Sequence, residues 1–206
     1  MLEILLEEPS AEVALDILMP IIQPGLVRGQ DFELRDFQGK SNLLKKLPDR
    51  LRGYASWAES ANIKFLILID RDDSDCVDLK QEILDIITLS GMKVGSLKEP
   101  ISGGSVVVRL ACEELESWFF GDPSALRKAY PKLPSAFETR AGLRDPDSIN
   151  GGTWERLEKL LQKAGYFTNG LAKLQLARSV SPYMIPDVNT SVSFQQFCRA
   201  VRHLTA

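Results

Sequence analysis

The sequence predicts an α/β domain with a doubly wound, mainly parallel sheet and helices on both faces. Short apolar runs of strand length alternate with longer amphipathic stretches in the first half of the chain, as in repeated β-α units. One run, residues 65–69, is apolar without interruption. That pattern is typical of a central parallel strand covered on both faces. Acidic residues directly follow two of the runs, at the end of the strands where such sheets bind ligands.

The first half of the chain contains the clearest strand and helix signals. An apolar run at residues 2–6 predicts the first strand, and the polar-apolar alternation of residues 31–37 predicts a half-buried second one. Two helical pieces are expected between residue 37 and the 65–69 strand. The first begins near Ser41 and ends before Pro48, because proline disfavours helix at the residue before it, and the second is capped by Asp49.

The rest of the chain is expected to be mostly helical. An amphipathic helix follows the 65–69 strand and leads to a short strand near residues 93–97. The later elements expected are a strand at 105–110, an aromatic helix at 113–120, a helix capped by Ser124, and helices at 153–164 and 194–204. The 206 residues are therefore predicted to form one domain, with an α/β core over about 1–120 and a helical C-terminal extension over about 121–206.

Composition narrows the class of protein. Hydrophobic residues make up 44% and charged residues 26%, which excludes a disordered chain, and no apolar run approaches the roughly 20 residues of a membrane-spanning helix. The first residues lack the basic start and apolar middle of a secretory signal, so we expect a cytoplasmic protein that does not contact the membrane. The net charge of −3 means that nucleic acid could bind only through a local basic patch.

Cysteine and histidine usage excludes several chemistries. Cys76, Cys112 and Cys198 are widely spaced and form no Cys-x-x-Cys pair, which argues against a disulfide framework and a zinc site. His203 is the only histidine. Mechanisms that use a serine or cysteine with a histidine base are therefore disfavoured.

Three carboxylates form the main candidate site. Glu7 follows the first predicted strand, and Asp70 and Asp72 follow the third. A doubly wound sheet can bring these side chains together at its ligand-binding edge, and hard oxygen ligands suit Mg²⁺ or Mn²⁺. Aspartates after strands also cap helices and solvate turns, so spacing alone leaves both interpretations open.

The same residues resemble a known pattern. A glutamate after strand one and Asp-x-Asp after strand three, here Glu7 and Asp70-Arg71-Asp72, resemble the Toprim motif. The segments 37–40, 44–51 and 113–118 are similar to an uncharacterised bacterial Toprim-like family, domain of unknown function 4276. The resemblance implies a Toprim-like, Rossmann-like fold. One departure is Glu8, which stands where Toprim patterns usually have glycine and could crowd a phosphate or add a ligand.

Toprim domains occur in topoisomerases, primases and nucleases, and stand-alone relatives are found beside AAA-type ATPases in phage-defence loci. The resemblance therefore implies a Mg²⁺- or Mn²⁺-dependent nuclease that acts as the effector partner of such an ATPase. Asp70 and Asp72 would hold the metal, and Glu7 would be a ligand or general base. The alternative is a catalytically silent Toprim-like module that binds an ATPase or nucleic acid. Neither the oligomeric state nor the choice between DNA and RNA follows from the sequence.

Glu116 is a further candidate. On a helix over 113–120, Glu113 and Glu116 lie one turn apart and can share a face, while Trp118 and Phe119 belong to the core. The acidic face is either simply solvated, or Glu116 is a further ligand or proton acceptor. The second interpretation follows from the resemblance, because Glu-x-Trp recurs in Toprim-like relatives.

Lys40 is the candidate phosphate-binding residue. Gly39-Lys40-Ser41 precedes a helix, but Leu34 stands where a nucleotide-binding P-loop has its first glycine, so a P-loop is excluded. A lysine at a helix start can still hold a phosphate. The basic run is either a solvated helix face or a nucleic-acid backbone contact, and it comprises Lys40, Lys45, Lys46, Arg50 and Arg52.

Overall fold

The computed structural model describes residues 1–72, 74–149 and 151–206. In this part of the chain, one five-stranded sheet has the strand order β2-β1-β3-β5-β4, and every neighbouring pair is parallel. The chain winds from β1 to one edge and then, through β3, to the other, which confirms the predicted doubly wound class. The strands are β1 (Leu2–Leu6), β2 (Phe32–Asp36), β3 (Lys64–Asp70), β4 (Lys93–Val94) and β5 (Ser105–Ala111).

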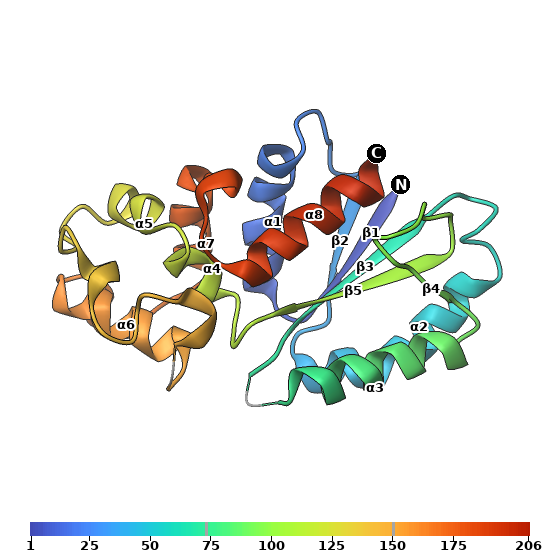
Figure 1. The fold of residues 1–206 in the computed structure, drawn as a ribbon, viewed down its shortest axis with the longest axis horizontal. Helices are drawn as coiled ribbons and strands as arrows, with labels where there is room; N and C mark the ends of the chain where they lie inside the picture. Colours follow the sequence, from blue (N-terminus) through green and yellow to red (C-terminus); the bar gives the residue numbers. More distant parts are fainter. Residues whose placement is uncertain (73, 150) are drawn as a thin grey trace.

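Helices cover both faces of the sheet (Figure 1). One face carries α2 (Lys40–Ala55) and α3 (Cys76–Leu89), and the other carries α1 (Pro9–Ile22) and α8 (Val192–Thr205). The side chains of β3 alternate between two buried hydrophobic clusters, with Phe65 and Ile67 toward α2 and α3 and Leu66 and Leu68 toward α1 and α8. This alternation explains why β3 is apolar throughout.

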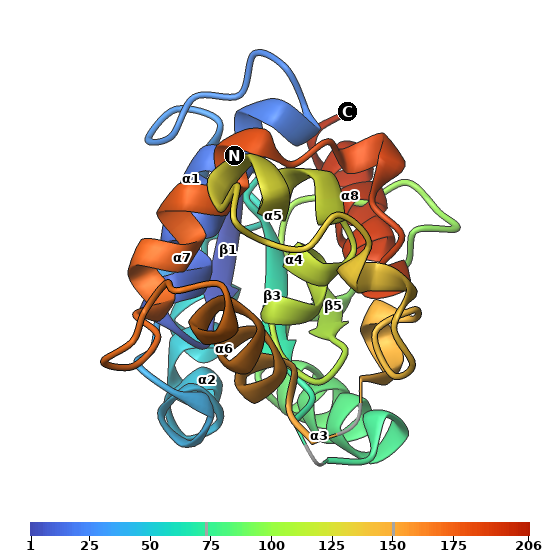
Figure 2. The same ribbon diagram turned by 90° about the vertical axis from the view of Figure 1, so that its left-hand side faces the viewer.

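The remaining helices gather beyond the carboxyl ends of the strands (Figures 1 and 2). They are α4 (Glu116–Phe120), α5 (Pro123–Ala129), α6 (Thr153–Lys163) and α7 (Lys173–Val180), joined by short 3-10 turns at Phe137–Thr139, Pro146–Ser148, Ser181–Tyr183 and Pro186–Val188. Residues from these helices, from α8 and from the sheet share one hydrophobic cluster. The segment expected as a C-terminal extension thus packs into the same core as the strands.

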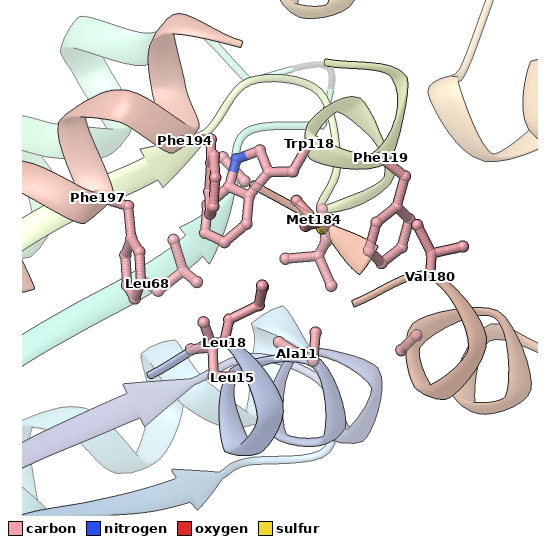
Figure 3. Packing of buried hydrophobic residues seen from close by; sticks show 14 of the residues in the cluster. Ala11, Leu15, Leu18, Leu68, Trp118, Phe119, Val180, Met184, Phe194 and Phe197 are labelled. Atoms are coloured by element: carbon pink, nitrogen blue, oxygen red, sulfur yellow. The ribbon is translucent and has the colours of Figure 1, made fainter. Parts of the chain in front are cut away.

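Trp118 joins this helical group to the sheet layer (Figure 3). Its ring lies 4.9 Å from that of Phe194 and 5.1 Å from that of Phe197, both on α8. Its Nε1 donates a hydrogen bond to Ser193 Oγ (3.0 Å). Trp118 and Phe119 are both buried, as the sequence predicts.

The predicted break of α2 at Pro48 is wrong, because one helix runs from Lys40 to Ala55 with the proline inside it. The buried residues of this helix are Leu43, Leu47, Leu51 and Tyr54, which recur every three or four positions on the face toward the sheet. Burying this stripe outweighs the backbone hydrogen bond that the proline removes, which would cost about 3 kcal/mol in an isolated helix.

Three other expectations also need correction. The aromatic helix begins at Glu116 rather than residue 113. Helix α5 is capped by Asp122, whose Oδ1 accepts the Ala125 N–H (3.0 Å), and not by Ser124. The strand expected at residues 93–97 is only Lys93–Val94.

Within the described ranges, no helix combines the length and the apolar character that crossing a membrane requires. All three cysteines are free thiols.

Candidate acidic site at the carboxyl edge of the sheet

Glu7 and Asp70 meet at the carboxyl edge of the two central strands. β1 and β3 are paired in parallel, with Leu6 opposite Leu68, so the residues that follow these positions lie next to each other at the carboxyl end of the sheet. The Asp70 N–H donates a hydrogen bond to Glu7 Oε2 (3.1 Å). Both residues are buried, at 8% exposure each. The strand order therefore brings two of the three predicted carboxylates together.

Asp72 lies near this pair but is engaged differently. Its φ of +50° places it in the left-handed region, and its N–H donates to the Glu113 carbonyl (2.8 Å). Its carboxylate accepts a hydrogen bond from the Lys40 ammonium (Nζ to Oδ2, 3.1 Å) and is about half exposed. Asp72 is close enough to Glu7 to raise the pKa of that side chain.

Lys40, the first residue of α2, ties the loop after β3 in place. Besides Asp72, its ammonium lies within hydrogen-bond distance of the carbonyls of Asp70 (2.9 Å) and Arg71 (2.9 Å) and of Ser74 Oγ (3.2 Å). An ammonium has only three protons to donate. To bind a phosphate, Lys40 would have to exchange at least one of these oxygens for it.

Glu116 reaches the same edge from α4. The residue is 1% exposed, and its Oε2 has no hydrogen-bond partner among the described residues. A buried polar atom without a partner is costly, so such atoms in native proteins call for an explanation, for example an ion that is bound there.

Lys173, the first residue of α7, supplies a positive charge that the sequence interpretation missed. Its Nζ lies 3.3 Å from Glu8 Oε2 and 3.8 Å from Glu114 Oε1. Glu116 contributes most to raising the pKa of Lys173 above its usual value, against the effect of burial. No local signal marks this lysine in the sequence, since only the packing of α7 against α1 brings it to the edge.

Glu8 does not need the conformational freedom of glycine. Its backbone is extended (φ −122°, ψ 151°) at the N-cap of α1. Its carboxylate accepts hydrogen bonds from Ser10 Oγ (3.1 Å) and from Lys173. The side chain thus belongs to the acidic group around Lys173.

The expectation that Glu113 and Glu116 share one face of a helix is wrong, because α4 begins only at Glu116. The alternative of a solvated acidic face is also wrong, because Glu116 is buried. Glu113 precedes α4 in the left-handed region (φ +62°) and forms an ion pair with Arg71. Glu114 accepts hydrogen bonds from Thr153 Oγ1 (3.0 Å) and the Trp154 N–H (2.8 Å) at the start of α6. The segment between β5 and α4 is therefore an ordered connection that joins the β3 loop to the helical group.

Burial shifts the pKa values of three carboxyl groups upward. Desolvation raises the pKa of Glu7 to about 7, with Asp72 and Glu8 adding to the rise and the Asp70 N–H and Lys40 opposing it. Desolvation likewise raises the pKa of Glu116 to about 7, with Lys173 opposing. The pKa of Asp70 is raised well above its usual range by burial and then by Glu7, Glu116 and Glu8. Burial is the largest cause of all three shifts, and the neighbouring lysines oppose it only in part.

The carboxylate oxygens at this edge are the type of ligand that a hard divalent cation binds. Carboxylate oxygens that are buried and short of positive charge are the ligands that Mg²⁺ and Mn²⁺ prefer, and Glu116 Oε2 is without a partner among the described residues. In the described ranges, no group of three or more Asp, Glu, His or Cys side chains is arranged so that it could hold a metal ion. Mg²⁺ usually keeps several waters and takes only one or two carboxylates, which Glu7 and Asp70 would supply here.

Fold and site together define a doubly wound α/β protein with a buried acidic group at the carboxyl edge of its sheet. The chain matches the family described as "Domain of unknown function (DUF4276)" over residues 6–202, and it belongs to that family. This confirms the family resemblance at the level of DUF4276.

Among solved structures, the chain is similar to the "C-terminal region of the Burkholderia pseudomallei OLD protein". The sequence identity is 18% and the TM-score 0.49, and the alignment covers 100% of this chain and 98% of that one. The comparison with curated proteins finds no match.

Proposed function

We propose that this protein is a Toprim-type nuclease that hydrolyses phosphodiester bonds of nucleic acid with the help of Mg²⁺ or Mn²⁺. The observation that carries the proposal is the buried Glu7–Asp70 pair, joined by a hydrogen bond between adjacent strands at the edge where doubly wound sheets bind ligands. Burial raises the pKa of both carboxyl groups, and a bound cation would favour their charged forms. The Toprim-like order of Glu7, Asp70 and Asp72 supports the same chemistry.

In this proposal, Glu7 and Asp70 would hold the metal, and Asp72, the third carboxylate expected from the sequence, would act on it through its nearby charge, because the described carboxylates form no group of three arranged to bind a metal ion directly. The metal would supply a lowered pKa of water and would neutralise charge on the phosphate. Glu7 is a ligand or the general base. Glu116, with a pKa of about 7, can accept and release a proton at neutral pH. Lys40 keeps Asp72 and the backbone of the β3 loop in place and is the candidate for contact with a phosphate.

The partners are part of the same proposal. The family resemblance suggests an effector that works with an AAA-type ATPase in bacterial phage defence, in the cytoplasm. Nucleic acid would contact the basic face of α2, where Lys45, Lys46 and Arg50 are all exposed. A solvated helix face explains those residues equally well, so salt dependence of binding must distinguish the two.

A nuclease assay with Asp72→Asn tests the proposal. This change removes a charge but hardly alters the shape of the side chain. Cleavage of single- and double-stranded DNA and RNA, measured with Mn²⁺ and with any ATPase encoded nearby, should fall by orders of magnitude. Asp36→Asn is the matched control, because Asp36 ends the neighbouring strand β2 at the same edge but is outside the acidic group. Equal cleavage by the wild type and Asp72→Asn would show that the active site lies elsewhere.

A second candidate is the catalytically silent module that only binds an ATPase or nucleic acid. The observation that favours it is that Lys40 and Lys173 already contact the acidic edge and partly neutralise it. In the same assay, no cleavage of any substrate by the wild type with the ATPase present would decide in favour of this module.

A further inference from the structure

The outer edge of β5 is mostly without a partner strand. β5 pairs with β3 from Val106 to Ala111, but β4 pairs only with Ser105 and Val106. After β4, the Gly95 N–H still donates to the Val106 carbonyl (2.8 Å). Beyond that hydrogen bond, the described chain contributes no strand next to residues 107–111 of β5, although an edge of this kind is a template for strand addition.

The register shows which backbone groups point outward. In a parallel strand, the N–H and C=O groups of alternate residues point to the same side. Because the Val106 carbonyl faces β4, those of Val108 and Leu110 face the open edge as well. The Val108 carbonyl accepts a hydrogen bond from its neighbour Arg109 (Nη1 to O, 2.8 Å). Among the described residues, the N–H groups of Val108 and Leu110 and the Leu110 carbonyl have no partner.

These groups lie in a slot between α3 and α8, which we name the β5 slot. Figures 1 and 2 show how these two helices flank β5. Its volume is about 590 Å³, and it continues into a second hollow of about 400 Å³ next to Gly95. One wall is formed by α3 with Val77 and Leu84, and the other by α8 with Val192 and Gln196. Val77 is 70% and Val192 is 64% exposed, so each wall presents an apolar side chain to solvent.

All charged residues that line the β5 slot and its continuation are basic. Lys80, Lys98, Arg109 and Arg199 line it and its continuation, and no acidic side chain does, although the whole chain has a net charge of −3. None of these four forms a salt bridge among the described residues. Burial and then the neighbouring Arg199 lower the pKa of Arg109, which an anion close by would reverse.

We propose that the β5 slot binds an extended acidic peptide segment of a partner protein, which adds to β5 as a further strand. The N–H groups of Val108 and Leu110 and the Leu110 carbonyl would pair with the backbone of the segment. Its apolar side chains would contact Val77 or Val192, and its acidic ones would face the basic residues. The proposal is independent of the function of the acidic edge.

Two other occupants fit less well. A second copy of this chain, paired edge to edge, would bring two identical basic sets together and leave them without counter-charges. Single-stranded nucleic acid would find basic residues, but the slot has no Trp, Tyr, Phe or His among its lining residues on which bases could stack. The strand edge itself also matches a peptide backbone and not a chain of phosphates.

Fluorescence anisotropy and amide hydrogen exchange test the proposal with a defined probe. The probe is a labelled peptide of alternating valine and glutamate about eight residues long, slightly longer than a typical strand. We expect saturable binding to the full chain, together with slower exchange of the Val108 and Leu110 amides. A peptide of alternating valine and lysine should not bind, and neither should oligothymidine of similar length.

Charge reversal provides the matched comparison. Lys80→Glu with Arg199→Glu should weaken binding of the acidic peptide by roughly tenfold or more, since two attractive pairs become repulsive. Lys159→Glu with Lys163→Glu, two exposed changes on α6, should leave the affinity unchanged. No binding of the acidic peptide, or binding that leaves the exchange of both amides unchanged, would show that the basic residues only shield the edge. Tighter binding of oligothymidine would make the slot a nucleic-acid site and overturn the proposal.

Discussion

Glu116 shows most directly how the acidic edge affects stability. Its carboxylate is buried with one oxygen unpartnered among the described residues, and its pKa rises from an ordinary 4.5 to about 7. Between these two pH values, the folded protein binds a proton that the unfolded chain has already released. Stability from this group is therefore highest below about pH 4.5 and falls as the pH rises toward 7.

We expect Glu116→Gln to remove part of this pH dependence. The shift of the pKa from 4.5 to about 7 corresponds to about 3 kcal/mol at most, and the raised pKa of Glu7 acts in the same direction over the same pH range. Urea unfolding in the absence of divalent cations should show the stability of the wild type decreasing from pH 5 to pH 7.5 and that of the variant decreasing less.

Glu82→Gln on the exposed side of α3 is the control, and it should follow the wild type. If wild type and Glu116→Gln lose stability in parallel as the pH rises, then the buried Glu116 carboxylate is compensated and our description of its surroundings is wrong.

At the scale of elements, Lys40 connects the start of α2 to the loop after β3. Four oxygens of this loop lie within 3.2 Å of its ammonium. In Lys40→Met, the loop should lose this anchor, and the Asp72 amide, which donates to the Glu113 carbonyl, should exchange its hydrogen faster.

Lys45→Met is the matched control for this prediction, because Lys45 is exposed on the same helix. Amide exchange followed by NMR at Asp72 should be faster in Lys40→Met and unchanged in the control. Equal exchange rates in the two variants would mean that the loop is held by its contacts with the β5–α4 connection and not by the lysine.

The elements also show how far the sequence alone could predict the structure. The strands β1, β2, β3 and β5 and the helices α1 and α3 followed from apolar periodicity, because each buries a face that the sequence displays. Pro48 was misleading because a local rule disfavours helix there, while the buried stripe of α2 is a tertiary effect. The start of α4 was misplaced because Glu113 adopts a left-handed conformation that a glutamate does not signal.

At the scale of the whole molecule, the candidate site is assembled from distant segments. Glu7 and Asp70 could be paired from the sequence, since the order of strands and the rule for parallel sheets place them at one edge. The position of Lys173 could not be predicted from the sequence, because this residue reaches the edge only through the packing of α7 on α1. The sequence therefore indicated the carboxylates but not the charge that balances them, and it gave no sign of the open edge of β5.

The central claim is that the acidic edge binds a divalent cation, and a thermal-shift titration with Mn²⁺ and Mg²⁺ tests it most directly. A ligand that binds only the folded state stabilises it by about 2.7 kcal/mol at a hundredfold excess over its Kd, which would raise the Tm of a chain of this size by several degrees. We expect this rise for the wild type and the Asp36→Asn control, and a much smaller one for Asp70→Asn. Equal shifts in all three proteins, or no shift in any, would contradict the claim.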